Sequence, residues 1–332
     1  MKVTILRVLC AVLLLGLCHS ATAQQKISIM VNGIDRQVYM PAKLTEQLGY
    51  FREQGLNVEL LSVPSGADAA NELLVGAVQG VVGFYDHTLD LQAKGKIVES
   101  VVQFSQAPGE VELVSSKVAD KIKSPADFKG KTLGVTGLGS STHFLSQYLA
   151  ASNGVNVSEV SFLGVGAGTT FIAAMKQGRI DAGMTTEPTV SRLLKTGEAK
   201  VLVDMRTPED TRKVLGGLYP ASCLYMQTSW VNAHKPEVQK LANALVKTLK
   251  YIQTHSAEEL ASKMPADYYA GDKVLYVQAL ADGKAMFTAD GRMPESGPPT
   301  VLKILSAFDK NIHGKNVDLS KTYTTEFVFA AK

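Results

Sequence analysis

The chain has 332 residues, a formal net charge of +3 and a hydrophobic share of 45%. This nearly balanced charge argues against a nucleic-acid partner, and the length favours two domains over one. Of the three cysteines, only Cys223 follows the predicted signal peptide, so the exported chain cannot close a disulfide within itself.

The first 23 residues are typical of a secretory signal peptide. Basic residues precede the apolar run 8–17, which is too short to span a bilayer, and Ala23 ends an Ala-x-Ala cleavage site. Cys18 raises the alternative of a lipoprotein, but Leu17 stands before it where a small residue would be expected. We therefore predict export to the periplasm with cleavage near Ala23.

The chain then alternates strands with helices. Strands are predicted at 27–31, 56–61 and 80–84, and helices at 40–54 and 68–75. Gly55 and Gly76 end the two helices. This β-α-β-α-β order implies parallel strands joined by right-handed crossovers.

The same order returns further along the chain. A strand at 132–136 and a helix at 141–153 are followed by a helix at 171–177, and 178–183 repeats the pattern of 76–81. Two such units suggest two similar lobes. The alternative is a chance likeness, because helix–glycine–strand patterns are common.

The remaining segments complete an α/β organisation. Strands are predicted at 96–104 and 199–204, hinges at 106–109 and 216–220, and helices at 236–254, 257–264, 273–281 and 299–308. The whole chain after 220 is expected to be helical. We predict one lobe from 24–107 with 220–332 and a second lobe from 108–219.

The loops that follow the first strand of each unit are the candidate ligand site. Ligands of open parallel sheets bind beyond the carboxyl ends of the strands, which here means the loops 32–39 and 136–142. Gly139-Ser140-Ser141-Thr142 opens a helix whose free N–H groups and hydroxyls suit an anion. An ordinary capped helix is the alternative.

Several stretches together point to a known family. They are Leu48-Gly49-Tyr50-Phe51, 55–58, Ser124-Pro125-Ala126-Asp127-Phe128-Lys129-Gly130-Lys131, 139–142, 178–182, Glu187-Pro188 and 322–327. In this order the chain resembles the solute-binding proteins of ABC importers for nitrate, sulfonates and taurine, which include binders of thiamine-pyrimidine precursors. The resemblance implies a two-lobed periplasmic-binding-protein fold of type II. It also implies two mixed β-sheets flanked by helices, with a hinge that closes the lobes around a small solute.

The resemblance also implies which residues bind the ligand. They are Asp35, Arg36, Gln37, Tyr39, Ser65, Gly66, Asp86, His87, Gly139, Ser140, Ser141, Thr142 and Glu187. Arg36 could pair with an acidic group or be a solvated loop charge. Asp86 and Glu187 could hold an amine, or could instead cap a helix or pair with a nearby base.

We therefore predict a monomeric periplasmic receptor that delivers a small solute to the membrane permease of an ABC importer. The solute is expected to be an anionic or zwitterionic organic molecule, sulfonate-like or an aromatic carboxylate. An enzyme similar to thiamine-pyrimidine synthases is the alternative on the same fold. Because the cysteine-rich motif of those enzymes is missing, we predict no catalytic residues and no enzyme. A receptor for a sensor protein is also compatible with the sequence. No cofactor is expected, and no metal site, because the histidines lack ligand spacing.

Overall fold

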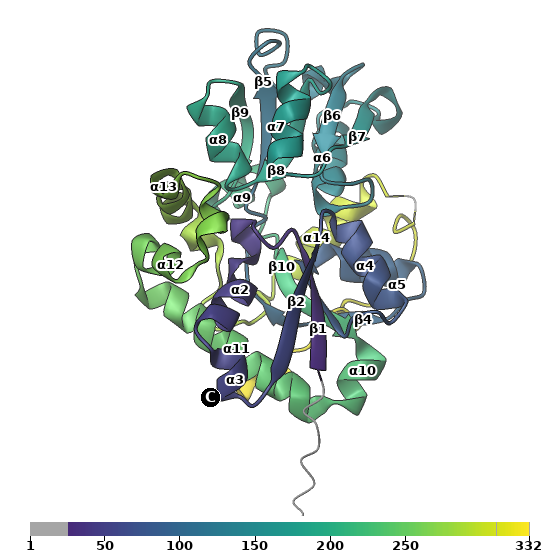
Figure 1. Cartoon of the computed structure of the whole chain (residues 1–332). Helices are drawn as coiled ribbons and strands as arrows, with labels where there is room; N and C mark the ends of the chain where they lie inside the picture. The colour runs from purple at the N-terminus through teal and green to yellow at the C-terminus, as the bar shows by residue number, and fades with distance from the viewer. Residues whose placement is uncertain (1–25, 310, 332) are drawn as a thin grey trace, which may run out of the picture.

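The computed structural model describes residues 26–309 and 311–331, and the predicted signal peptide lies outside them. Two five-stranded sheets form the framework, one above the other in Figure 1. The lower sheet has the order β2 (Asn57–Val63), β1 (Lys26–Asn32), β3 (Gly80–Phe84), β10 (Ser222–Gln227) and β4 (Val98–Gln103). The upper sheet has the order β7 (Ser161–Gly164), β6 (Thr132–Val135), β8 (Ala182–Thr186), β5 (Glu110–Ser115) and β9 (Ala199–Met205).

The two sheets share one topology. In each, a first strand pairs in parallel with the next two strands of its unit, β1 with β2 and β3, and β6 with β7 and β8. Two antiparallel pairings then extend each sheet. In the lower sheet β3 pairs with β10 and β10 with β4, and in the upper sheet β8 pairs with β5 and β5 with β9. The predicted α/β fold with two mixed sheets is confirmed, and the predicted repeat corresponds to this shared order.

Helices flank both sheets, as Figure 1 shows. The lower part carries α2 (Met40–Gln47), α3 (Tyr50–Glu53), α4 (Gly66–Leu74), α5 (Asp86–Ala93), α10 (Thr228–Ala233) and α11 (Lys235–Thr254). The upper part carries α6 (Ser141–Ser152), α7 (Thr169–Lys176), α8 (Thr189–Lys195) and α9 (Pro208–Leu215). The remaining helices are α12 (Ala257–Lys263), α13 (Lys273–Gly283), α14 (Gly297–Ser306) and α15 (Glu326–Phe329). Among the described helices, none has both the length and the apolar character needed to cross a membrane.

Two sequence-based predictions are wrong in their detail. The segment after residue 220 is not helical throughout, because it contains β10, which lies between β3 and β4 in the lower sheet. Its residues from Ser222 to Met226 are all buried, so the strand lacks the polar alternation that would reveal it. The predicted helix 40–54 is also interrupted, because Gly49 adopts φ +76° between α2 and α3.

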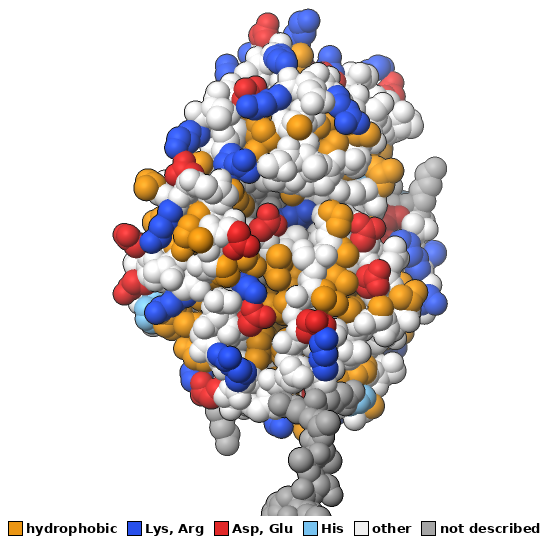
Figure 2. All heavy atoms as spheres, in the orientation of Figure 1, with side chains coloured by type: hydrophobic (Ala, Val, Ile, Leu, Met, Phe, Trp, Pro, Cys, Tyr) orange, Lys and Arg blue, Asp and Glu red, His pale blue; other side chains and the backbone are white. Residues whose placement is uncertain are grey.

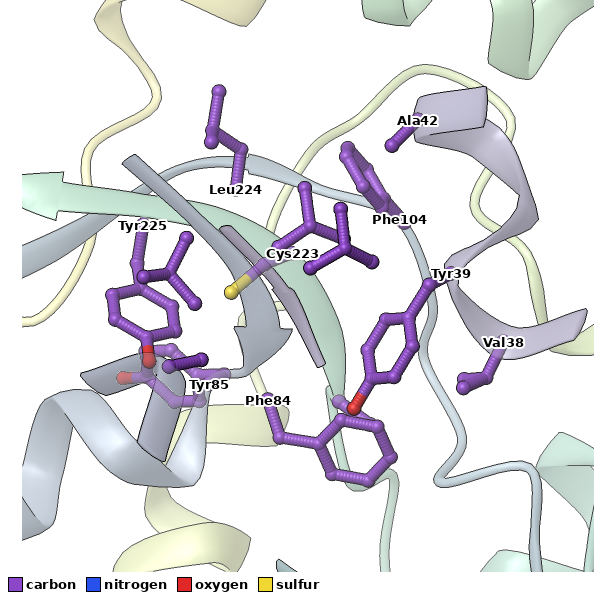
Figure 3. Packing of buried hydrophobic residues seen from close by; sticks show 14 of the residues in the cluster. Val38, Tyr39, Ala42, Phe84, Tyr85, Phe104, Cys223, Leu224 and Tyr225 are labelled. Atoms are coloured by element: carbon purple, nitrogen blue, oxygen red, sulfur yellow. The ribbon is translucent and has the colours of Figure 1, made fainter. Parts of the chain in front are cut away.

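The hydrophobic core of the lower sheet reaches the interface between the sheets. The ring of Tyr39 stands edge-on to Phe84, with 5.9 Å between ring centroids, and Phe104 and Cys223 are fully buried beside them (Figure 3). The hydroxyl of Tyr39 accepts a hydrogen bond from Asn32 Nδ2 at 2.8 Å. The apolar core therefore ends at a polar layer, and this layer faces the upper sheet.

Two segments carry the chain between the sheets. They run side by side, since Ser105 Oγ accepts from the Ser222 amide at 2.9 Å and Ser105 O accepts from the Ala221 amide at 3.2 Å. Helix α13 adds a third link, because it packs on α8 and Asp272 just before it pairs with Lys195. The boundaries drawn for the two lobes at 107, 108, 219 and 220 stay a prediction.

Candidate ligand site

The strand-to-helix loops of the two sheets meet at the interface. The Gln37 amide donates to Glu187 O at 3.1 Å, and the Ala67 amide donates to Ser140 Oγ at 3.4 Å. Figure 2 shows acidic and basic side chains around the hollow between the upper and lower parts of the molecule. A pocket of about 290 Å³ opens there between the segments 33–36 and 62–64 below and 166–170 above. The loops predicted from sequence therefore face one another.

Asp86 links the two sheets directly. It is the first residue of α5, is fully buried, and accepts hydrogen bonds from Ser141 Oγ of α6 and from the Tyr219 hydroxyl, both at 2.8 Å. Burial raises the pKa of this carboxyl, while the charge of His87 and the two hydroxyl donors oppose the rise. The predicted residues Asp86 and Ser141 are thus brought together across the interface.

The predicted anion-binding loop 139–142 uses its polar groups within the protein. The Gly139 amide donates to His143 Nδ1 at 3.0 Å, and Thr142 Oγ1 accepts from the Thr136 amide at 3.0 Å. Ser140 and Ser141 contact the lower sheet's loops as described above. This helix start therefore contacts the loops of the lower sheet through Ser140 and Ser141, and its role in binding a ligand stays a prediction.

Arg36 is a buried cation, not a solvated loop charge. Only 4% of the residue is exposed, and its two terminal nitrogens donate to Asn32 Oδ1 at 3.3 Å and to Pro64 O at 2.6 Å. Its Nε has no acceptor, and it forms no ion pair with any carboxylate that the structure describes. Because Arg36 also lines the pocket at the interface, it is suited to receive an acidic group.

Glu187 pairs with a basic side chain of the protein, which is the alternative to holding an amine of the ligand. It is 3% exposed, and it accepts from Arg206 Nη1 at 2.9 Å and from the amide and hydroxyl of Ser191 at 3.0 Å each. Burial raises its pKa, and the Ser191 amide and Arg206 act in the opposite direction. Its carboxylate oxygens are thus already hydrogen-bonded within the upper sheet's own elements.

The other predicted residues surround this interface. Ser65 caps α4, because its Oγ accepts from the Asp68 amide at 3.2 Å. Ser65 also packs against Gly137, since a Cβ added to Gly137 would lie 2.7 Å from the Cβ of Ser65. Gln37 donates from Nε2 to Tyr276 O at 2.9 Å. Asp35 is exposed at the pocket rim. Their part in binding stays a prediction.

Sequence reasoning missed Glu110, the first residue of β5. Burial raises the pKa of Glu110 well above its usual value; the charge of Asp86 adds to the rise and that of Arg36 opposes it. Burial likewise raises the pKa of Tyr39, where Arg36 lowers it and Glu110 and Asp86 raise it further. The pKa of Tyr219 is raised by burial and then by Asp86 and Glu110. We use the name inter-sheet cluster for the buried residues that these pKa shifts involve, which are Arg36, Tyr39, Asp86, Glu110 and Tyr219.

Gly66 and His87 are packed too closely for a larger side chain. A Cβ on Gly66 would lie 2.4 Å from His87 Nε2, and His87 is 1% exposed. We expect Gly66→Ala to displace the imidazole and to lower the free energy of unfolding by about 1–3 kcal/mol. Chemical denaturation measures this loss. Gly164→Ala is the control, because Gly164 has no positive φ and an added Cβ there would come no closer than 3.6 Å to its nearest neighbour. Equal stability of Gly66→Ala and wild type would contradict the close packing.

A metal centre does not emerge from the described residues. Within 26–309 and 311–331, no group of three or more His, Cys, Asp or Glu side chains is arranged to hold an ion. The single cysteine in this part of the chain, Cys223, is buried in the lower core.

Comparison with known families and curated proteins relates the chain to one protein family. The sequence model of the NMT1/THI5-like family matches residues 38–259. A 4-amino-5-hydroxymethyl-2-methylpyrimidine phosphate synthase of Aspergillus parasiticus is 27% identical over 70% of this chain and 68% of that protein. The THI13 synthase of Saccharomyces cerevisiae is 27% identical over 49% of this chain, but the match spans only 46% of that protein.

These names contradict the prediction that the chain is not an enzyme. Both relatives are named as synthases, and that name describes an enzyme. The missing cysteine-rich motif was therefore too narrow a reason to exclude enzymes.

Solved structures show what the fold is similar to. A protein of Bordetella bronchiseptica RB50 is 37% identical, covers 92% of this chain and 96% of its own, and superposes with a TM-score of 0.88. A ligand-binding component of an ABC-type import system from Staphylococcus aureus is 15% identical over 93% of this chain and 99% of its own, with a TM-score of 0.70. The alkanesulfonate-binding protein SsuA of Xanthomonas axonopodis pv. citri, solved with MOPS, is 20% identical over 92% and 100%, with a TM-score of 0.69.

Proposed function

Since the chain belongs to the NMT1/THI5-like family, we propose that it captures a small organic solute between its two sheets and delivers it to an ABC importer. The observation that carries this proposal is Arg36, a buried guanidinium at the pocket between the sheets with no carboxylate partner among the described residues. An unpaired buried cation is costly unless an anion joins it. A solute with an acidic group, such as a sulfonate or an aromatic carboxylate, would supply that anion.

The strength of such binding requires contacts from both sheets. Micromolar affinity needs about 8 kcal/mol, while one charge-assisted hydrogen bond contributes roughly 1.5–3 kcal/mol. Arg36 alone is therefore insufficient, and groups from the upper sheet must reach the same solute. Closure of the two sheets on each other, which the contact between Asp86 and Ser141 would stabilise, would bring those groups to the solute.

The names of the solved neighbours support the proposal that the captured solute is delivered to an ABC importer. The Staphylococcus aureus protein is a component of an ABC-type import system, and the Xanthomonas protein binds an alkanesulfonate. These names support a membrane permease as the partner. We propose further that the protein works in the periplasm as a monomer, exported by the signal peptide. Co-purification of the protein with a permease would favour a role in transport over a role as the receptor for a sensor protein.

A thermal-shift screen over small anions, amines and heterocycles tests the proposal. A solute at a hundred times its Kd adds about 2.7 kcal/mol to the stability of the folded protein, which shifts the melting temperature visibly. We expect Arg36→Gln to weaken the best solute by about tenfold to a hundredfold, the loss of one charge-assisted contact. The exposed Arg52→Gln is the matched control and should leave the affinity unchanged. A screen that finds no stabilising solute would argue against solute capture.

Catalysis by the same site is a second candidate, because the curated relatives are named as synthases. Incubating the protein with each compound that the screen returns and analysing the mixture by mass spectrometry tests it. A new product that requires the folded protein would establish an enzyme, whereas unchanged compounds would leave binding as the function.

A further inference from the structure

Helix α7 begins with backbone donors that the protein leaves unmatched. Its N-cap is Gly168, which has no side chain to cap the helix, and no acidic residue lies in its first turn. The amides of Thr169 and Thr170 meet no acceptor in the part of the chain that the structure describes. By contrast, α4 carries the Ser65 cap and has Asp68 in its first turn. The start of α7 therefore has a positive potential that its own side chains do not offset.

This helix start opens into the pocket between the two sheets. Gly166, Ala167 and Thr170 line the pocket from the upper sheet's elements, and Gly33 and Arg36 line it from the lower sheet's elements. Its volume of about 290 Å³ is at the lower end of the range for ligand pockets. The pocket is therefore of a size to hold one charged group of a solute.

Arg36 gives an independent indication that an anion belongs in this pocket. A guanidinium has five N–H donors, and the structure accounts for two of them, one to Asn32 Oδ1 and one to Pro64 O. The Nε of Arg36 is buried without an acceptor among the described residues. The carboxylate that lines the pocket belongs to Asp35, which is exposed, so water screens its charge. A buried cation and an unmatched helix start thus face the same pocket from opposite sheets.

The geometry of these donors suits a tetrahedral oxyanion with two charges. The two oxygens of a carboxylate lie in one plane, whereas the three terminal oxygens of a phosphomonoester point apart and carry close to two negative charges near neutral pH. Guanidinium groups and helix N-termini both bind phosphate well. The start of α6 is less suited to such a group, because Ser141 there already donates to the carboxyl of Asp86.

We propose that the pocket between Arg36 and the start of α7 is a phosphate subsite, which takes the phosphoryl group of a phosphomonoester. This inference rests on the proposed function, solute capture between the sheets. It adds the first turn of α7, with Thr169 and Thr170, to the groups that hold the solute. Binding there joins the lower sheet to the upper sheet through a single group, since its oxygens accept from both.

Matched esters of phosphate and sulfate test the subsite by calorimetry. The methyl, phenyl and para-nitrophenyl esters supply three pairs of similar shape, in which the phosphate member carries the greater negative charge. In at least one pair we expect the phosphate ester to bind wild type at least about tenfold more tightly than the sulfate ester. This preference should grow from pH 5 to pH 7, because the phosphate ester loses its second proton near pH 6. Both members meet the same protein groups, so their ratio isolates the charge of the ligand.

Thr170→Asp separates binding at α7 from the stability of the fold. An acidic residue in the first turn of a helix is favourable, and Thr170 is exposed, so the variant should melt no lower than wild type. It should weaken the phosphate ester by at least about tenfold, because its carboxylate repels the anion. Ser229→Asp is the matched control, since it adds the same charge to the first turn of α10, away from the pocket. It should keep the wild-type affinity.

Three results would overturn the subsite. They are sulfate esters that bind as tightly as phosphate esters, phosphate esters that do not bind at millimolar concentration, and a folded Thr170→Asp variant that binds them like wild type. If another solute of the thermal-shift screen binds and depends on Arg36 in any of these cases, solute capture itself still stands. If Thr170→Asp fails to fold by circular dichroism, the wild-type preference and its change with pH still decide the outcome.

Discussion

Asp86→Ala is expected to lower the free energy of unfolding by about 2–5 kcal/mol, because it leaves two buried hydroxyls without an acceptor. The hydroxyls belong to Ser141 and Tyr219, each 2.8 Å from the carboxylate. Ser141 lies on the upper sheet's α6 and Asp86 on the lower sheet's α5, so part of this loss weakens the contact between the two sheets. We expect the variant to bind its solute at least about tenfold more weakly.

Small-angle X-ray scattering distinguishes loss of closure from general destabilisation. The solute-free Asp86→Ala variant should show a larger radius of gyration than wild type at a temperature where both are folded. Asp90→Ala is the control, since Asp90 is also buried on α5 but pairs with Lys94 of the same helix at 2.7 Å. It should change stability without changing the radius of gyration. An unchanged radius in Asp86→Ala would mean that the carboxylate does not hold the sheets together.

The framework of both sheets could be predicted because its parallel units carry clear local signals. Gly55 and Gly76 end helices with φ near +66° and +78°, and the strands that follow are short apolar runs. The antiparallel strands β5 and β10 lacked such signals. Both are buried on both faces, so polar residues such as Glu110 and Ser222 sit in the core and break the expected pattern.

The candidate site was only partly accessible to sequence reasoning. The loops at the carboxyl ends of the strands were expected, and the structure brings Asp86 to Ser141 and Gln37 to Glu187. The partner of each polar group could not be predicted, because it depends on how two remote segments pack. Glu187 meets Arg206 within the upper sheet's elements, whereas Glu110 meets no donor there. The alternation of Val111 and Leu113 with Glu110 and Glu112 indicates a strand, but it predicts a solvated face for both glutamates. No signal in the sequence therefore predicts the burial of Glu110.

Glu112→Gln is expected to remove a large part of the loss of stability that wild type suffers as the pH rises. Burial raises the pKa of Glu112 from about 4.5 to about 8, and the Ser146 hydroxyl opposes the rise. Between these two values the unfolded chain has released the proton that the folded protein still holds. The free energy of unfolding therefore falls by about 1.4 kcal/mol for each pH unit in that window. Stability from this group is complete below pH 4.5 and is lost as the pH approaches 8.

Glutamine at this position cannot ionise, so the variant keeps its stability across the same window. Denaturation at a series of pH values should show the two proteins diverging upward from pH 5, with the variant more stable than wild type by roughly 2–4 kcal/mol near pH 8. Other buried carboxyls with raised pKa values, Asp86 and Glu110 among them, leave a residual slope in both proteins. The exposed Glu258→Gln should follow the wild-type curve. Parallel curves for wild type and Glu112→Gln would mean that Glu112 is ionised in the folded protein, and the upper sheet would then have to hold a buried charge on β5.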